Sequence, residues 1–243
     1  MNIRLAWRLA RILLHLIEGL AKCALVFPWA SPATRQRLTL GWSRRLLGIC
    51  GVRLTPVDGA PALAHALVVA NHVSWLDIFV INALYPSRFV AKAEIRRWPV
   101  VGWLVAMAGT VFIARGNRRD LRHVFKGLVA SLQTGERVAF FPEGETAPPG
   151  VVLPFHANLF EAAIDAKVPV QPFALKYVDA GGALHHAVDF TGDTTFVDSV
   201  MKILRADGLE AQLACLEPIE AAGAHRRDLA QAARAEIESA MAA

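Results

Sequence analysis

The sequence has few cysteines, and nothing in it marks a boundary between large domains. Cys23, Cys50 and Cys215 stand far apart in 243 residues and show no metal-ligand spacing. Their odd number and wide separation argue against a disulfide framework or a zinc site and fit a reducing compartment. Internal repeats, low-complexity segments and polar linkers are also missing. The length therefore indicates one domain of ordinary size with a short appendage.

Acidic residues are nearly missing from residues 1–57, where Glu18 stands against nine Lys or Arg. The formal net charge of the chain is +5, so the basic character belongs to this N-terminal part. Its cations alternate with Leu, Ile, Trp and Phe, unlike the polar, glycine-rich arms that bind nucleic acid. Hydrophobic residues make up 54% of the chain and the mean hydropathy is +0.36, both high for a soluble protein. These features favour membrane lipids over nucleic acid as the partner.

Residues 2–29 contain no proline before Pro28, and their polar residues recur every three or four positions. These polar residues are Arg4, Arg8, Arg11, His15, Glu18 and Lys22. The spacing predicts a helix with one polar stripe and a wide apolar arc. A signal peptide would carry its charges before an unbroken apolar core, and a spanning helix would not carry six polar groups. We expect a helix that lies in a membrane interface, with the stripe turned to water or to protein.

A second basic helix is predicted over residues 33–49, between Ser31-Pro32 and Gly51. Residues 1–50 are therefore expected to be basic amphipathic membrane-anchoring helices, and residues 51–243 to be the globular domain. The alternative is that both helices pack on the domain as ordinary amphipathic elements. The width of the apolar arc favours the membrane.

After Gly51, short apolar runs alternate with helical patterns. Strands are predicted at 52–57, 66–70, 88–92, 109–113, 137–141 and 168–175, and helices at 75–84, 100–108, 119–133, 159–166 and 226–242. Such alternation predicts an α/β fold with helices on the faces of a sheet.

The stretch Ala-Asn-His-Val-Ser-Trp-Leu-Asp, residues 70–77, follows one of these strands. Ser74 and Asp77 have the spacing of a helix capping box, which accounts for both without catalysis. It does not account for His72, which lies in the strand-to-helix turn where α/β folds place catalytic groups. A neutral imidazole can accept a proton from a hydroxyl, and Asp77 can reach its other ring nitrogen. A serine hydrolase is disfavoured because the G-x-S-x-G elbow is missing.

Two further strand ends carry chemistry. The run Gly-Thr-Val-Phe-Ile-Ala-Arg ends with Arg115, a fixed positive charge suited to a phosphate. The run Arg-Val-Ala-Phe-Phe-Pro-Glu-Gly-Glu-Thr brings Glu143 to the sheet edge, and Gly144 allows the backbone to approach a ligand. Each signal alone is weak, but their order along the chain is specific.

The ordered set N-H-V-S-W-L-D, G-T-V-F-I-A-R, F-P-E-G-E-T and V-P-V-Q-P resembles the four-block pattern of glycerolipid acyltransferases. The bacterial 1-acylglycerol-3-phosphate acyltransferases are the closest in pattern, over about residues 67–175. The resemblance implies a mixed sheet flanked by helices and transfer of a fatty acyl group to the free hydroxyl of a lysophospholipid, lysophosphatidate to phosphatidate. The donor would be a thioester of coenzyme A or acyl carrier protein. No cofactor or metal is implied, and the location would be the cytoplasmic face of the inner membrane, peripheral or monotopic.

By the same resemblance, particular residues take particular roles. His72 is the general base with Asp77 as its partner, and the acceptor's phosphate is bound by Lys92, Arg115, Glu143 and Gly144.

The third block departs from its relatives, which commonly continue E-G-T-R, because Glu145 and Thr146 follow the glycine here. His156 stands where relatives often have a lysine. Both changes lower the positive charge near the head-group site. A lyso-ornithine lipid, or another lyso-lipid with a less anionic head, is therefore an alternative acceptor. A non-catalytic lipid-binding module is the competing class of function.

Overall fold

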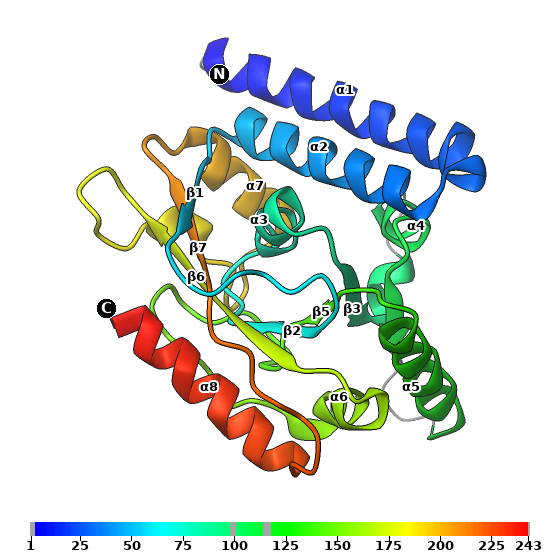
Figure 1. The fold of residues 1–243 in the computed structure, drawn as a ribbon. Helices are drawn as coiled ribbons and strands as arrows, with labels where there is room; N and C mark the ends of the chain where they lie inside the picture. Colours follow the sequence, from blue (N-terminus) through cyan, green and yellow to red (C-terminus); the bar gives the residue numbers. More distant parts are fainter. Residues whose placement is uncertain (1–2, 98–100, 114–117, 243) are drawn as a thin grey trace.

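The computed structural model describes residues 3–97, 101–113 and 118–242 (Figure 1). The strands are β1 (Arg53–Val57), β2 (Leu67–Ala70), β3 (Arg88–Lys92), β4 (Val111–Ile113), β5 (Val138–Phe140), β6 (Val170–Val178) and β7 (Glu210–Cys215). The α-helices are α1 (Ile3–Leu25), α2 (Pro32–Cys50), α3 (Asp77–Leu84), α4 (Val101–Met107), α5 (Arg118–Gln133), α6 (Glu161–Ala166), α7 (Phe196–Arg205) and α8 (Arg226–Ala242). Short 3-10 helices lie at η1 (Phe27–Trp29), η2 (Ala93–Arg97), η3 (Ala157–Phe160) and η4 (His186–Val188).

Within the described residues the strands form a seven-stranded sheet in the order β1-β7-β6-β2-β5-β3-β4. The pairs from β6 through β2, β5 and β3 to β4 are parallel. β7 runs antiparallel to β6, and β1 runs parallel to β7. The sheet is therefore mixed, as the resemblance predicts, and its parallel part ends all its strands at one edge.

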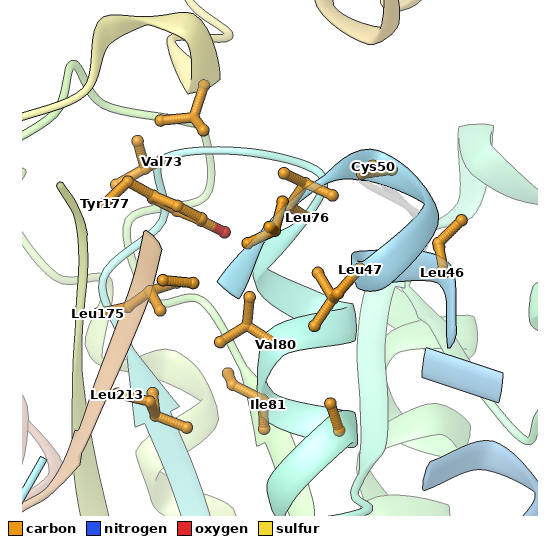
Figure 2. Close-up of a cluster of buried hydrophobic side chains, with 14 of the residues drawn as sticks. Leu46, Leu47, Cys50, Val73, Leu76, Val80, Ile81, Leu175, Tyr177 and Leu213 are labelled. Carbon is orange, nitrogen blue, oxygen red and sulfur yellow. The ribbon is translucent and has the colours of Figure 1, made fainter. Parts of the chain in front are cut away.

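Helices cover both faces of the sheet, which explains why every residue of β2 is buried. On one face α2, α3 and α7 contribute Leu47, Val80 and Ile203 to the main hydrophobic cluster. Figure 2 shows part of this cluster, with side chains of α2 and α3 packed against those of β6 and β7. On the other face the core is built by α5, α6 and α8, which contribute Leu128, Ala163 and Leu229.

Helix α1 lies alongside α2 on the outside of the molecule (Figure 1), and several residues of its polar stripe contact other parts of the chain. Arg8 Nη1 donates to the Leu204 carbonyl at the end of α7 (2.7 Å), and Arg4 forms an ion pair with Asp207. His15 is buried and stacks on Trp42 of α2, with ring centroids 4.4 Å apart. The stripe is therefore divided between the two environments that the sequence left open, because His15 is buried against protein whereas Arg11 is exposed.

The opposite side of α1 and the following η1 expose large apolar side chains. They are Ile3, Trp7, Leu13, Leu14, Ile17 and Leu25, followed by Val26 and Trp29. Leu5, Leu9 and Ile12 of α1 pack against the main hydrophobic cluster, so only part of its wide apolar arc contacts the domain. The exposed part favours the expected interfacial helix over the alternative, in which both helices pack on the domain as ordinary amphipathic elements. Among the helices of the described segments, none combines the length and the hydropathy needed to cross a membrane.

The first helix ends at Leu25, because Pro28 belongs to a separate 3-10 turn and does not continue the α-helix to residue 29. Helix α3 begins at Asp77, two residues later than predicted. α7 and β7 were not predicted at all. The β7 sequence, Glu-Ala-Gln-Leu-Ala-Cys, lacks the β-branched and aromatic residues that mark strands.

Candidate active site

The site residues lie where parallel neighbouring strands end. His72 follows β2, Glu143 follows β5, and Lys92 is the last residue of β3. Because β2, β5 and β3 are adjacent and parallel, their carboxyl ends meet at one edge of the sheet. In open α/β sheets this edge is where ligands bind. Arg115, which follows β4, lies outside the described residues.

His72 and Asp77 are in direct contact across the strand-to-helix turn. The distance from His72 Nδ1 to Asp77 Oδ2 is 2.7 Å. An ionised carboxylate can only accept, so Nδ1 carries the proton, and in the neutral imidazole Nε2 then has a lone pair. The His72 side chain is 19% exposed whereas that of Asp77 is fully buried. This arrangement leaves one ring nitrogen of His72 as a proton acceptor for a hydroxyl brought to the site.

Asp77 is buried without losing hydrogen bonds. Its Oδ2 also accepts the backbone N–H groups of Val73 and Ser74, at 2.7 and 2.9 Å, and its Oδ1 accepts the Tyr177 hydroxyl at 2.7 Å. As the first residue of α3, it also lies at the positive end of the helix dipole. These donors stabilise a buried negative charge that would otherwise be costly.

Of the two reciprocal hydrogen bonds of the capping box predicted for Ser74 and Asp77, one is present. The Ser74 N–H donates to Asp77, and Ser74 Oγ accepts the N–H of Leu76 at a long 3.4 Å. Ser74 is fully buried. A hydroxyl in that position is not available to attack a substrate.

The imidazole is held in its plane by an aromatic neighbour. Phe141, which follows β5, stacks on His72 with ring centroids 4.0 Å apart and an interplanar angle of 8°. Phe89 of β3 supports Phe141 from beyond, at 5.8 Å between centroids. Rotation of His72 away from Asp77 would break both the stacking and the hydrogen bond.

Glu143 holds the backbone of the histidine turn. Its Oε1 accepts the His72 N–H at 2.7 Å and its Oε2 accepts the Leu153 N–H at 2.9 Å. The side chain is buried, and this burial raises the pKa of Glu143 to about 6, although the two backbone donors favour the ionised form. The Ala147 N–H donates to the His72 carbonyl at 2.7 Å. The loop 143–147 therefore forms hydrogen bonds with both the backbone N–H and the backbone carbonyl of His72.

Gly144 adopts a left-handed conformation (φ +76°) directly after Glu143. A Cβ at this position would lie 3.2 Å from the ring of His156, so the turn has little room for a side chain. Lys92 and Glu145 are exposed. Within the described part of the chain, no group of three or more His, Cys, Asp or Glu side chains is arranged as metal ligands.

A sequence model of the acyltransferase family matches residues 52–176, more than half of the chain. The chain belongs to the acyltransferase family. It is 36% identical over 246 aligned residues to the lyso-ornithine lipid O-acyltransferase of Pseudomonas aeruginosa, with 99% of this chain and 94% of that enzyme covered. It is 46% identical over 154 residues to the 1-acyl-sn-glycerol-3-phosphate acyltransferase of Neisseria meningitidis serogroup B. That match spans 62% of this chain and 60% of the Neisseria enzyme.

The fold of this acyltransferase is that of a solved member of the family. The crystal structure of the 1-acyl-sn-glycerophosphate (LPA) acyltransferase PlsC from Thermotoga maritima superimposes with a TM-score of 0.64. The alignment covers 97% of this chain and 98% of the other at 21% sequence identity. The likeness therefore extends over the N-terminal helices as well as the sheet.

The sequence of the acyltransferase did not predict a role for several residues that shape the site. Asn71 is fully buried and exchanges two hydrogen bonds with the backbone of Leu175, which extends the pairing of β2 and β6. Asn71 and Phe141 lie within the motifs quoted above, so their place in these motifs was a signal for both. Tyr177 lies 100 residues after Asp77. Nothing in the sequence connects these two residues.

Proposed function

We propose that this protein transfers a fatty acyl group from a thioester to the free hydroxyl of a lyso-lipid, with His72 as the general base and Asp77 as its orienting partner. The observation that carries the proposal is the 2.7 Å contact between His72 Nδ1 and a fully buried carboxylate. It leaves Nε2 as the second ring nitrogen of a partly exposed side chain at the sheet edge where a ligand would bind. A non-catalytic lipid-binding module would have no need for such a pair.

In this mechanism, His72 Nε2 takes the proton of the acceptor hydroxyl as the hydroxyl oxygen attacks the thioester carbonyl. The tetrahedral intermediate collapses, the carbon–sulfur bond breaks, and the imidazolium returns its proton to the departing thiolate. Asp77 stabilises the imidazolium and holds its tautomer. The acyl group passes directly to the acceptor, which agrees with the burial of Ser74.

For the acceptor head group we propose Lys92, Arg115 and the backbone around Gly144 as the binding elements. Lys92 is exposed at the end of β3, beside the strand that leads to Glu143. Glu143 was predicted to bind substrate directly. Both its oxygens accept backbone N–H groups, which supports an indirect role, in which Glu143 shapes the turn that meets the head group.

We assign residues 1–50 to membrane anchoring and residues 51–243 to the acyltransferase domain. The exposed apolar face of α1, with Trp7, Leu14 and Ile17, supports a peripheral or monotopic position on the cytoplasmic face of the inner membrane. The donor would be acyl-coenzyme A or acyl carrier protein, both of which present a thioester from the aqueous side. No cofactor enters the scheme.

Replacement of His72 tests the chemistry. We expect His72→Ala to abolish transfer while leaving the fold and membrane binding intact, because the base acts only in the chemical step. Asp77→Asn should reduce kcat by roughly 10²- to 10⁴-fold through the wrong tautomer. Acyl transfer from both thioester donors to purified protein in lipid vesicles would be measured. A His72→Ala enzyme that keeps more than about a tenth of the rate would exclude general-base catalysis by this residue.

A lyso-ornithine lipid is the second candidate acceptor. The Pseudomonas relative named for that substrate aligns over 99% of this chain, whereas the Neisseria 1-acyl-sn-glycerol-3-phosphate acyltransferase aligns over 62%. The residues near Gly144 also favour a lyso-ornithine lipid as the acceptor. Thr146 and His156 stand where relatives have cations, and the added acid Glu145 is suited to an ammonium group but not to a phosphate.

The two acceptors are separated by the variant Glu145→Thr. If lysophosphatidate is the acceptor, removing this exposed negative charge should raise its kcat/KM about two- to fivefold, the size expected for exposed charge pairs. Adding Thr146→Arg should raise it further. If lyso-ornithine lipid is the better acceptor of the parent enzyme and Glu145→Thr weakens its use, the second candidate replaces the first. Glu161→Thr, at an acidic residue that forms an ion pair with Arg226, is the control for charge alone.

A further inference from the structure

The geometry points to Tyr177 as a positioning residue for acyl transfer, which fixes the Asp77 carboxylate and through it the His72 base. The inference rests on the proposed function and adds a residue that no motif contains. Tyr177 donates its hydroxyl to Asp77 Oδ1 at 2.7 Å, while Asp77 Oδ2 faces His72 Nδ1. The two oxygens of one carboxylate thus have different partners.

Tyr177 reaches the site because β6 is longer than its neighbour β2. The register pairs Ala70, the last residue of β2, with Phe173, and β6 continues to Val178. Side chains alternate along a strand, so Phe173, Leu175 and Tyr177 share one face. All three are buried on the side of α3. In Figure 2 the Tyr177 ring lies among the labelled apolar side chains, with its oxygen turned toward Leu76 just before α3.

Packing alone does not account for a phenol at this position. Phenylalanine would fill the same apolar space without placing a polar atom in the core. Burial, followed by the nearby negative charge of Asp77, raises the pKa of Tyr177 well above its ordinary value. The hydroxyl therefore stays protonated and acts as a donor at any pH at which the enzyme works.

The donated proton has two consequences for the base. It prevents the Asp77 carboxylate from rotating, so that Oδ2 remains on the line to the imidazole. It also draws negative charge toward Oδ1, so less of it acts on His72. Without the hydroxyl, a buried anionic oxygen would lose its partner, which is far more costly than losing a neutral hydrogen bond.

The chain contains two tyrosines, which provides a matched control. Tyr177→Phe should lower kcat about tenfold, the lower end for a hydrogen bond to an ionised group. The KM values for donor and acceptor should change little. Because more negative charge then faces the imidazolium, the acid limb of the kcat/KM profile should move to higher pH. Tyr85→Phe, at a tyrosine that packs on Phe173, should change neither kcat nor the acid limb of the kcat/KM profile.

The neighbouring titratable groups stay the same in both variants. Glu143 faces the backbone of His72, and Cys50 of α2 lies near the Tyr177 hydroxyl. Burial raises the pKa of Cys50 to about 12, so it remains a neutral thiol through the profile. A moved acid limb in Tyr177→Phe would therefore report on the Tyr177 hydrogen bond.

A double-mutant cycle gives a second measurement. If Tyr177 acts through Asp77, the kcat effect of Tyr177→Phe should disappear in the Asp77→Asn background. An unchanged kcat and pH profile in Tyr177→Phe, or equal effects in both backgrounds, would overturn the inference. So would a Tyr177→Phe protein that fails to fold while Tyr85→Phe folds, because that marks a structural role. Loss of activity in His72→Ala preserves the proposed function in all these cases.

Discussion

Two buried carboxylates, Asp77 and Glu143, hold the histidine turn in different ways. Asp77 contacts the imidazole itself, and its spacing from His72 could be interpreted from the sequence because both residues belong to one short turn. Glu143 contacts the backbone N–H of His72 from another strand. The sequence placed it correctly at the sheet edge, but the direction of its side chain depends on how β2 and β5 pair.

Glu143 should leave a signature in the pH dependence of stability. Its pKa rises from an ordinary 4.5 to about 6 on folding, so the folded state binds more protons between these values. The free energy of unfolding should therefore fall as pH rises through this window, by on the order of 1 kcal/mol from this group. Glu143→Gln, which cannot titrate, should lose this component. Urea unfolding of both proteins from pH 4.5 to pH 6.5 would measure it.

The exposed neighbour Glu145 provides the control for that experiment. Glu145→Gln removes the same charge from the same loop and should leave the slope of stability against pH close to that of the parent protein. Equal slopes in Glu143→Gln and the parent would contradict the raised pKa of Glu143. In Glu143→Gln the side-chain NH₂ group would face one of the two backbone N–H donors that Glu143 accepts, those of His72 and Leu153. Because two donors cannot form a hydrogen bond with each other, the activity of this variant should also fall.

Helix α1 shows what periodicity predicts and what it leaves open. The spacing of its polar residues correctly predicted a single stripe but not what the stripe contacts. Arg8 donates to the Leu204 and Ala206 carbonyls at the C-terminal end of α7, and the glycine at position 51 leaves room for its guanidinium. Such partners exist only after α7 has packed on the sheet, and α7 was not predicted. The sequence therefore could not decide between water and protein.

The outward face of α1 should determine how tightly the protein binds vesicles. Leu14 is 65% exposed, and its insertion among lipid chains would contribute about 1.5–3 kcal/mol. We expect Leu14→Ser to weaken binding to anionic vesicles at least tenfold without lowering the thermal unfolding temperature. Val197→Ser, at an equally exposed apolar residue of α7, is the control. A Leu14→Ser protein that binds vesicles as the parent does would exclude this face as the membrane contact.

At the scale of the whole molecule, the fold class could be predicted from the sequence, but some pairings between distant segments could not. Alternating strands and helices indicated an α/β sheet, and the order of the motifs placed the site at one edge. The antiparallel pairing of β6 with β7 followed from neither, because β7 is rich in alanine and polar residues. Pairings between distant segments are decided by packing in three dimensions, and the contact of Tyr177 with Asp77 belongs to the same class.

Removal of residues 1–29 should separate membrane binding from the fold of the remaining chain. Helix α2 contributes Leu46, Leu47 and Cys50 to the main hydrophobic cluster, so it should stay in place. The loss of His15 would uncover Trp42, which favours aggregation. We expect the truncated protein to leave the membrane fraction for the soluble or aggregated fraction. The full-length protein should bind less at high salt. Unchanged partition of the truncated protein would contradict the anchoring role of α1.

The hydrogen bonds between the loop 143–147 and His72 make the proposed base and the proposed head-group turn one unit of local unfolding. Glu143 accepts the His72 N–H, and the Ala147 N–H donates to the His72 carbonyl. Neither amide can exchange its hydrogen with solvent unless the contact between the two segments opens. An opening that admits a bulky head group by moving this loop would therefore also release the histidine that we propose as the base. If the proposed roles hold, entry of the acceptor and the readiness of His72 to accept a proton are a single equilibrium.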